Sequence, residues 1–142
     1  MARHTELGAW GEDLVRRRLA TVAPVAAGER ADLQVEGIEI EVKTSRPSRA
    51  DQDRRRPRYQ FCLRREGHHT DMHGDVLVLV LAPEGTCYVI PRPEVPRARV
   101  LKMGPCTERW EPYREAWWVL ADLLEAREFD EVATPLAQPV RG

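Results

Sequence analysis

The sequence predicts an α/β (α+β) fold in which a central sheet is flanked by helices. Apolar residues recur at helical spacing near the start of the chain and again after Trp110, as in amphipathic helices. Between these segments lie several short β-branched or apolar runs separated by turn residues, which are typical of strands. The chain has 142 residues, the size of one ordinary domain. We therefore expect a single domain over residues 1–133 and a flexible tail, 134–142, that contains two prolines.

The two predicted helices cover residues 5–20 and 110–126. Thr5 is a suitable N-cap for the first helix, because its hydroxyl can accept a hydrogen bond from the first helical turn. The second helix carries two adjacent tryptophans, Trp117 and Trp118, which cannot both face the same core. One of them is therefore expected on the surface, where it would suit the interface of a homodimer.

A β-hairpin is predicted over residues 31–36 and 37–43, where apolar residues flank the tight-turn dipeptide Glu36-Gly37. Residues 75–81 form an almost continuous apolar run, which is typical of a central strand covered on both faces. Residues 44–58 contain two prolines and a single apolar residue, so a basic loop is expected there. Further strands are predicted at residues 21–27, 59–63, 86–90 and 99–103.

Charge is segregated along the chain, although the formal net charge is only -1. Residues 44–65 hold eight arginines and two aspartates, a net of +6, whereas residues 108–131 have a net of -5 from eight acids and three arginines. A basic segment of this kind is suited to the DNA backbone, although a solvated linker has the same composition. The candidate DNA-binding residues are Arg46, Arg49, Arg54, Arg55, Arg56 and Arg58.

The cysteine and hydropathy patterns favour a cytoplasmic protein. Cys62, Cys87 and Cys106 are odd in number and widely spaced, which argues against a disulfide framework and a cysteine-rich zinc site. No stretch approaches the roughly 18 apolar residues of a membrane span, so no membrane partner is expected. His69 and His73 have a spacing that could bind zinc on a helix, but a phosphate-contacting or solvated loop that also contains His68 is the favoured interpretation.

The hairpin also carries the residues best suited to catalysis. On its second strand Glu41 and Lys43 share one face with Glu39, by the two-residue period of a strand. If the turn closes with two residues, Asp32 on the partner strand lies near the level of Glu41. Two close carboxylates repel unless a cation sits between them, and such oxygen ligands suit Mg²⁺ or Mn²⁺. The alternative is that these side chains form the solvated face of an edge strand.

A family resemblance strengthens the catalytic interpretation. Asp32, followed by Ile38-Glu39-Ile40-Glu41-Val42-Lys43, resembles the D…(D/E)xK signature of the PD-(D/E)xK nuclease superfamily, which includes archaeal Holliday junction resolvases and many restriction enzymes. In those resolvases, and in small bacterial nuclease-like proteins, a preceding helix carries a G-x-x-x-E or G-x-x-G-E pattern. Gly8-Ala9-Trp10-Gly11-Glu12 matches both. In place of the proline that the family name implies before the aspartate, this chain has Ala31.

The resemblance implies a restriction-endonuclease-like core with a mixed central sheet, and a Mg²⁺-dependent endonuclease that cuts DNA, including branched or structured DNA. By the resemblance, Asp32 and Glu41 would be metal ligands, Lys43 the catalytic lysine, and Glu12 an accessory carboxylate on the same metal. Gln60 would be a polar residue beside the active site. The alternative is a nuclease-like module that has lost activity and only binds DNA or protein.

Overall fold

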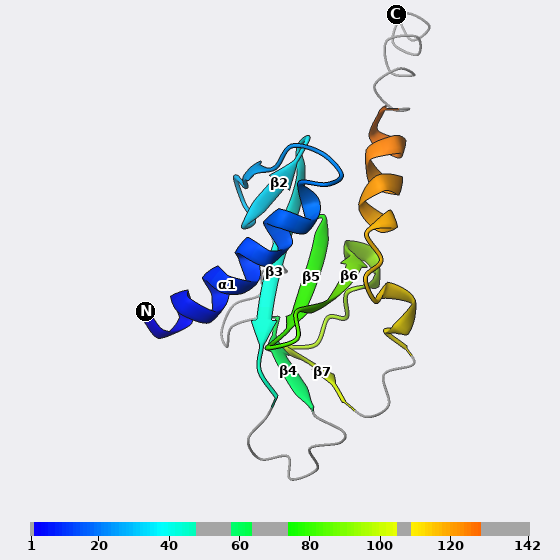
Figure 1. The fold of residues 1–142 in the computed structure, drawn as a ribbon. Helices are drawn as coiled ribbons and strands as arrows, with labels where there is room; N and C mark the ends of the chain where they lie inside the picture. Colours follow the sequence, from blue (N-terminus) through cyan, green and yellow to red (C-terminus); the bar gives the residue numbers. More distant parts are fainter. Residues whose placement is uncertain (1, 48–57, 64–73, 105–108, 129–142) are drawn as a thin grey trace, which may run out of the picture.

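The structure, a computed structural model, describes residues 2–47, 58–63, 74–104 and 109–128 (Figure 1). Its helices and strands are α1 (Ala2–Leu19), β1 (Ala26–Ala27), β2 (Leu33–Val35), β3 (Ile38–Ser45), β4 (Tyr59–Cys62), β5 (Val76–Leu81), β6 (Thr86–Pro91), η1 (Arg92–Glu94), β7 (Val100–Met103), η2 (Glu111–Tyr113) and a C-terminal helix at 118–128.

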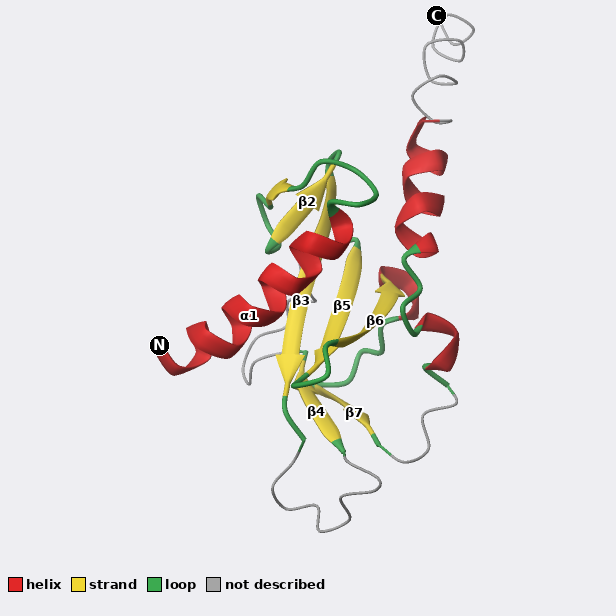
Figure 2. Cartoon of the chain, in the orientation of Figure 1, coloured by secondary structure: helices red, strands yellow, loops and turns green. Residues whose placement is uncertain are grey.

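The strands form a five-stranded sheet and a separate two-stranded one. The larger sheet has the order β1-β2-β3-β5-β6, and β4 pairs with β7. β3 and β5 run parallel, whereas the other pairs are antiparallel. α1 lies across the larger sheet and packs on β3, with the C-terminal helix farther along the sheet (Figure 2). The predicted fold class, a mixed central sheet flanked by helices, is confirmed.

The predicted hairpin is confirmed together with its register. Glu36 and Gly37 both have positive φ, 48° and 86°. Positive φ at both residues is required in the two-residue turn whose twist matches that of the flanking strands. The register pairs Val35 with Ile38 and Leu33 with Ile40. β3 continues to Ser45, beyond the predicted end at residue 43, because β5 pairs with it in parallel from Ile40 to Ser45.

β5 separates two hydrophobic clusters, as expected for a strand covered on both faces. All six of its residues are buried. Val76, Val78 and Val80 pack in a first cluster that includes side chains of α1, of the hairpin and of the C-terminal helix. The leucines between them pack in a second cluster with Tyr59 and Phe61 of β4. The short sheet of β4 and β7 therefore covers the face of β5 that α1 leaves free.

Several boundaries differ from those predicted. α1 begins at Ala2, so Thr5 lies within the helix and is not its N-cap. Of residues 21–27, only Ala26–Ala27 pair, as an edge strand. The strands predicted at 59–63, 75–81, 86–90 and 99–103 are confirmed with small shifts. The predictions for most of the basic loop, His68, His69, His73 and the C-terminal tail fall outside the described residues.

The predicted helix over 110–126 is wrong in its first half. A single 3₁₀ turn, η2, is followed by Glu115 at a positive φ of 47°, and the helix begins only at residue 118. The Glu115 carboxylate accepts hydrogen bonds from the Cys87 amide at 2.7 Å and the Trp117 indole at 3.0 Å, and it pairs with Arg18 at 2.8 Å. This left-handed residue therefore links β6, α1 and the chain leading into the last helix.

The tryptophan pair agrees with expectation. Trp117 packs on the first cluster, whereas the side chain of Trp118 is 56% exposed. Cys87 is a buried free thiol. No helix among the described residues is long and apolar enough to cross a membrane.

Candidate active site

An edge of β3 begins where its pairing with β2 ends. β2 pairs with β3 only as far as the Leu33–Ile40 pair, whereas β5 pairs with the other side of β3 as far as Ser45. Continuing this register places Asp32 opposite Glu41. The Asp32 Oδ2 atom accepts a hydrogen bond from the Val42 amide at 2.8 Å. Asp32 is thus held against the strand that carries Glu41.

α1 approaches this edge closely because of a glycine. A Cβ at Gly11 would collide with the hydroxyl of Thr44, so only glycine allows this contact between α1 and β3. The next residue, Glu12, is half-buried. Burial raises the pKa of the Glu12 carboxyl, the negative charge of Asp32 raises it further, and Arg16 lowers it. Glu12 and Asp32 are therefore close enough to repel each other.

Glu41 and Lys43 share one face of β3, opposite Leu77 and Leu79 of β5 in the parallel register. Both are half-buried. Within the part of the chain that the structure describes, neither side chain forms a hydrogen bond or an ion pair. A carboxylate and an ammonium group that are partly withdrawn from water are thus left available to a ligand.

The remaining predicted site residues lie elsewhere. Gln60 is exposed on β4, opposite Lys102 of β7, and its side chain alternates with those of Tyr59 and Phe61, which face the core. Gln60 therefore points away from the layer between the two sheets. Of the basic loop, Arg46 and Arg58 are described and exposed. Arg49, Arg54, Arg55 and Arg56 lie outside the described residues.

The carboxylates do not form a closed metal cage. Among the described residues, no group of three or more His, Cys, Asp or Glu side chains is arranged to hold a metal ion. Asp32 and Glu41 offer an open pair, with Glu12 near Asp32. An open pair suits Mg²⁺, which binds through one or two carboxylates and keeps several water ligands.

Glu39 has a function that sequence reasoning missed. By strand period it shares a face with Glu41, but its carboxylate accepts backbone hydrogen bonds from Arg30 at 2.9 Å and Ala31 at 3.0 Å. A longer contact at 3.4 Å comes from the Glu29 amide. Glu39 thus anchors the loop that leads into Asp32. Two features of the sequence could have indicated this contact: Glu39 is a third carboxylate on this face of the strand, and a glycine-containing turn lies at residues 28–31.

The backbone hydrogen bonds from Ala31 and Arg30 lower the pKa of Glu39. Its ionised form therefore stabilises the fold at pH above the unfolded-state pKa, and this contribution is lost as the pH falls through the lowered folded-state value. We expect Glu39→Gln to be less stable than the wild type near pH 7, with the difference shrinking between about pH 5 and pH 3. Urea unfolding across this range measures it, with the exposed Glu125→Gln as control. A difference independent of pH would contradict this role.

Comparisons with known proteins place the fold. The sequence matches no protein-family model and no curated protein. Among solved structures, the chain is similar to a bacterial homing endonuclease, I-Ssp6803I, with 21% identity over 86% of this chain and 94% of that one, and a TM-score of 0.61. The chain therefore shares the overall fold of that protein. The similarity covers nearly the whole of the neighbour, so it concerns the complete architecture of that chain rather than one shared motif.

Proposed function

We propose that this chain is a divalent-metal-dependent DNA endonuclease of the PD-(D/E)xK type. The observation that carries the proposal is the edge of β3, where the bond from the Val42 amide holds Asp32 opposite Glu41, with Lys43 on the same face as Glu41. These positions support the interpretation of the D…(D/E)xK signature as an active site. The fold shared with a homing endonuclease supports the same class of function.

The residues present fit a hard divalent cation. Asp32 and Glu41 provide carboxylate oxygens, and the repulsion between Glu12 and Asp32 is of the kind that a cation relieves. In the proposed site, Asp32 and Glu41 hold Mg²⁺ or Mn²⁺, and Glu12 assists directly or through a water. When bound, such an ion polarises the phosphate and makes a coordinated water more acidic.

Lys43 and the arginines supply positive charge for the phosphates. Lys43 lies two residues beyond Glu41, about 7 Å along the strand, where its ammonium group can orient a water or stabilise the charge that develops on the attacked phosphate. Arg46 at the end of β3 and Arg58 before β4 are exposed at the two ends of the basic loop. In the proposal they hold the DNA backbone and leave the chemistry to the edge of β3.

The proposal is tested by incubating the full chain with supercoiled plasmid and with a four-way DNA junction, with and without Mg²⁺ or Mn²⁺. We expect cleavage only with the metal, and its loss in Glu41→Ala. The exposed Glu125→Ala on the C-terminal helix is the matched control and should cut normally. Preferential cleavage of the junction would assign a resolvase-like activity. Equal cleavage by wild type and Glu41→Ala would refute this site, and metal-independent DNA binding without cleavage would favour an inactive binding module.

A further inference from the structure

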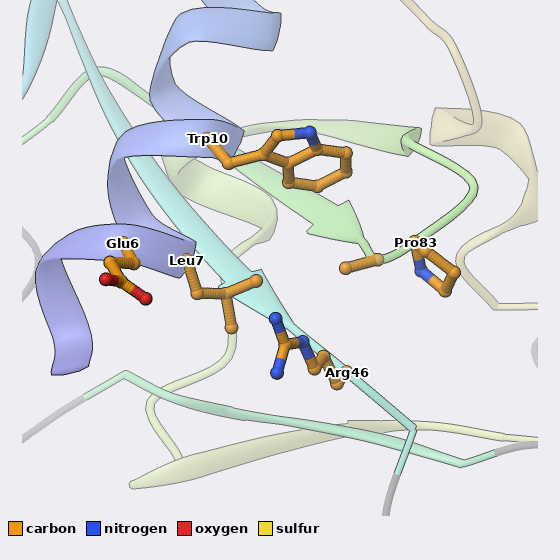
Figure 3. A pocket seen from close by; sticks show the side chains of 6 residues that line it. Glu6, Leu7, Trp10, Arg46 and Pro83 are labelled. Atoms are coloured by element: carbon orange, nitrogen blue, oxygen red, sulfur yellow. The ribbon is translucent and has the colours of Figure 1, made fainter.

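A pocket of about 320 Å³ lies between α1, the end of β3 and the turn that joins β5 to β6. Its volume is at the lower end of the range for small-ligand sites, about 300–1,000 Å³. Figure 3 shows the side chains of Leu7, Trp10 and Pro83 around an open space, with the guanidinium group of Arg46 reaching toward it from the end of β3. Glu6 and Ala82 complete the lining.

The pocket combines a flat aromatic surface with one cation. Trp10 is 36% exposed, and its ring edge lies near the turn at Gly85, 4.0 Å from the position that a Cβ on that glycine would take. Arg46 is exposed, and within the described residues its guanidinium group forms no hydrogen bond or ion pair. The carboxylate of Glu6 points away from Trp10 (Figure 3). The arginine is therefore free to bind an anionic group.

We infer that this pocket binds an unpaired nucleobase of the DNA substrate, stacked on Trp10, with a neighbouring phosphate on Arg46. The inference rests on the proposed nuclease function. Every base has a flat π-face that can stack on an indole, and the planar guanidinium group of arginine matches phosphate oxygens. An apolar side chain of a protein partner would fill the pocket but would give Arg46 no counter-charge.

The position of the pocket specifies which DNA can use it. Trp10 and Glu12 are two residues apart on α1, about 200° around the helix, so the pocket and the metal ligands lie on different sides of α1. Arg46 directly follows β3 and is three residues beyond Lys43, about 10 Å along the extended chain, a distance that one DNA strand covers in about three nucleotides. A base in an intact duplex is covered by its stacked neighbours and cannot enter. The pocket thus favours bulged, gapped or branched DNA that carries an unpaired base close to the cleavage point.

The test compares three labelled duplexes of one sequence: fully paired, with a single-base bulge, and with an abasic bulge that keeps the phosphates. Binding to the full chain is measured by fluorescence anisotropy without divalent metal, so that no cleavage is needed. We expect the base-containing bulge to bind about tenfold more tightly than the abasic bulge, within the range of base–aromatic stacking. Trp10→Ala should abolish this difference, Trp10→Phe should retain most of it, and Trp118→Ala, which removes an exposed indole elsewhere, should leave it unchanged.

Arg46→Ala should weaken binding of all three duplexes and lower the salt dependence by about one phosphate contact, which Arg97→Ala should not do. Equal wild-type affinity for the two bulges, or a difference that survives in Trp10→Ala, would overturn the inference. In either case metal-dependent plasmid cleavage would leave the proposed nuclease function standing. Conversely, base-dependent binding by a chain that cuts no DNA would support the pocket and contradict the nuclease.

Discussion

Lys43→Ala is expected to slow DNA cleavage by about 10²–10³-fold, the usual cost of removing one group that stabilises charge in a transition state. Lys43 is half-buried and shares the face of Glu41. Its ammonium group is therefore partly desolvated, and its interaction with a phosphate bound at the metal would be stronger than in water. Because Lys43 is not a proposed metal ligand, its loss should reduce the rate of the chemical step and leave metal affinity unchanged.

Single-turnover cleavage at saturating protein measures this rate separately from DNA binding. The control is Lys102→Ala, which removes an exposed lysine from β7. It should cut at the wild-type rate. An unchanged rate in Lys43→Ala, or an equal loss in Lys102→Ala, would show that Lys43 has no specific part in the reaction.

Two glycines of α1 should respond oppositely to alanine. At Gly11 the added methyl group meets the side chain of Thr44, so α1 must move away from β3. We expect Gly11→Ala to lower the free energy of unfolding by about 1–3 kcal/mol, the usual cost of overpacking. At Gly8 a Cβ meets nothing within 4 Å, so Gly8→Ala should raise it by up to about 1 kcal/mol through helix propensity.

Urea denaturation of the wild type and the two variants gives both values under the same conditions. Gly11→Ala should also reduce cleavage, because the displaced helix carries Glu12 away from Asp32. Stabilisation by both substitutions would mean that the contact between α1 and β3 is looser than the structure has it. Destabilisation by both would indicate that helix propensity does not govern the Gly8 position.

The local features of the fold were predictable from the sequence, whereas those that depend on distant contacts were not. The Glu36-Gly37 turn fixed the register of the hairpin and hence the level of Asp32 beside Glu41, because two-residue turns allow few geometries. The left-handed Glu115 was missed, since its partners, Cys87 and Arg18, are distant in sequence. Helical periodicity alone therefore predicted a continuous helix across Glu115.

In the candidate site, too, the local features were predictable from the sequence and those that depend on distant contacts were not. The two-residue period of the strand predicted that Glu41 and Lys43 share a face, but it also placed Glu39 with them, and only the loop hydrogen bonds reveal its separate function. Glu12 was predicted as a site residue only from the family resemblance. Its position beside Asp32 depends on the packing of Gly11 on Thr44, a contact that no local sequence pattern indicates. The pocket beside Trp10 joins three separate segments, so no local pattern could indicate it.

In the proposed site, Asp32 and Glu41 share one divalent cation. Calorimetric titration of the full chain with Mn²⁺ tests it without requiring any cleavage. We expect one bound ion per chain, with binding lost in Asp32→Asn and in Glu41→Gln and retained in Lys43→Ala, while circular dichroism shows that all variants remain folded. Wild-type Mn²⁺ binding in both carboxylate variants, or no binding by the wild type, would contradict a shared cation at Asp32 and Glu41.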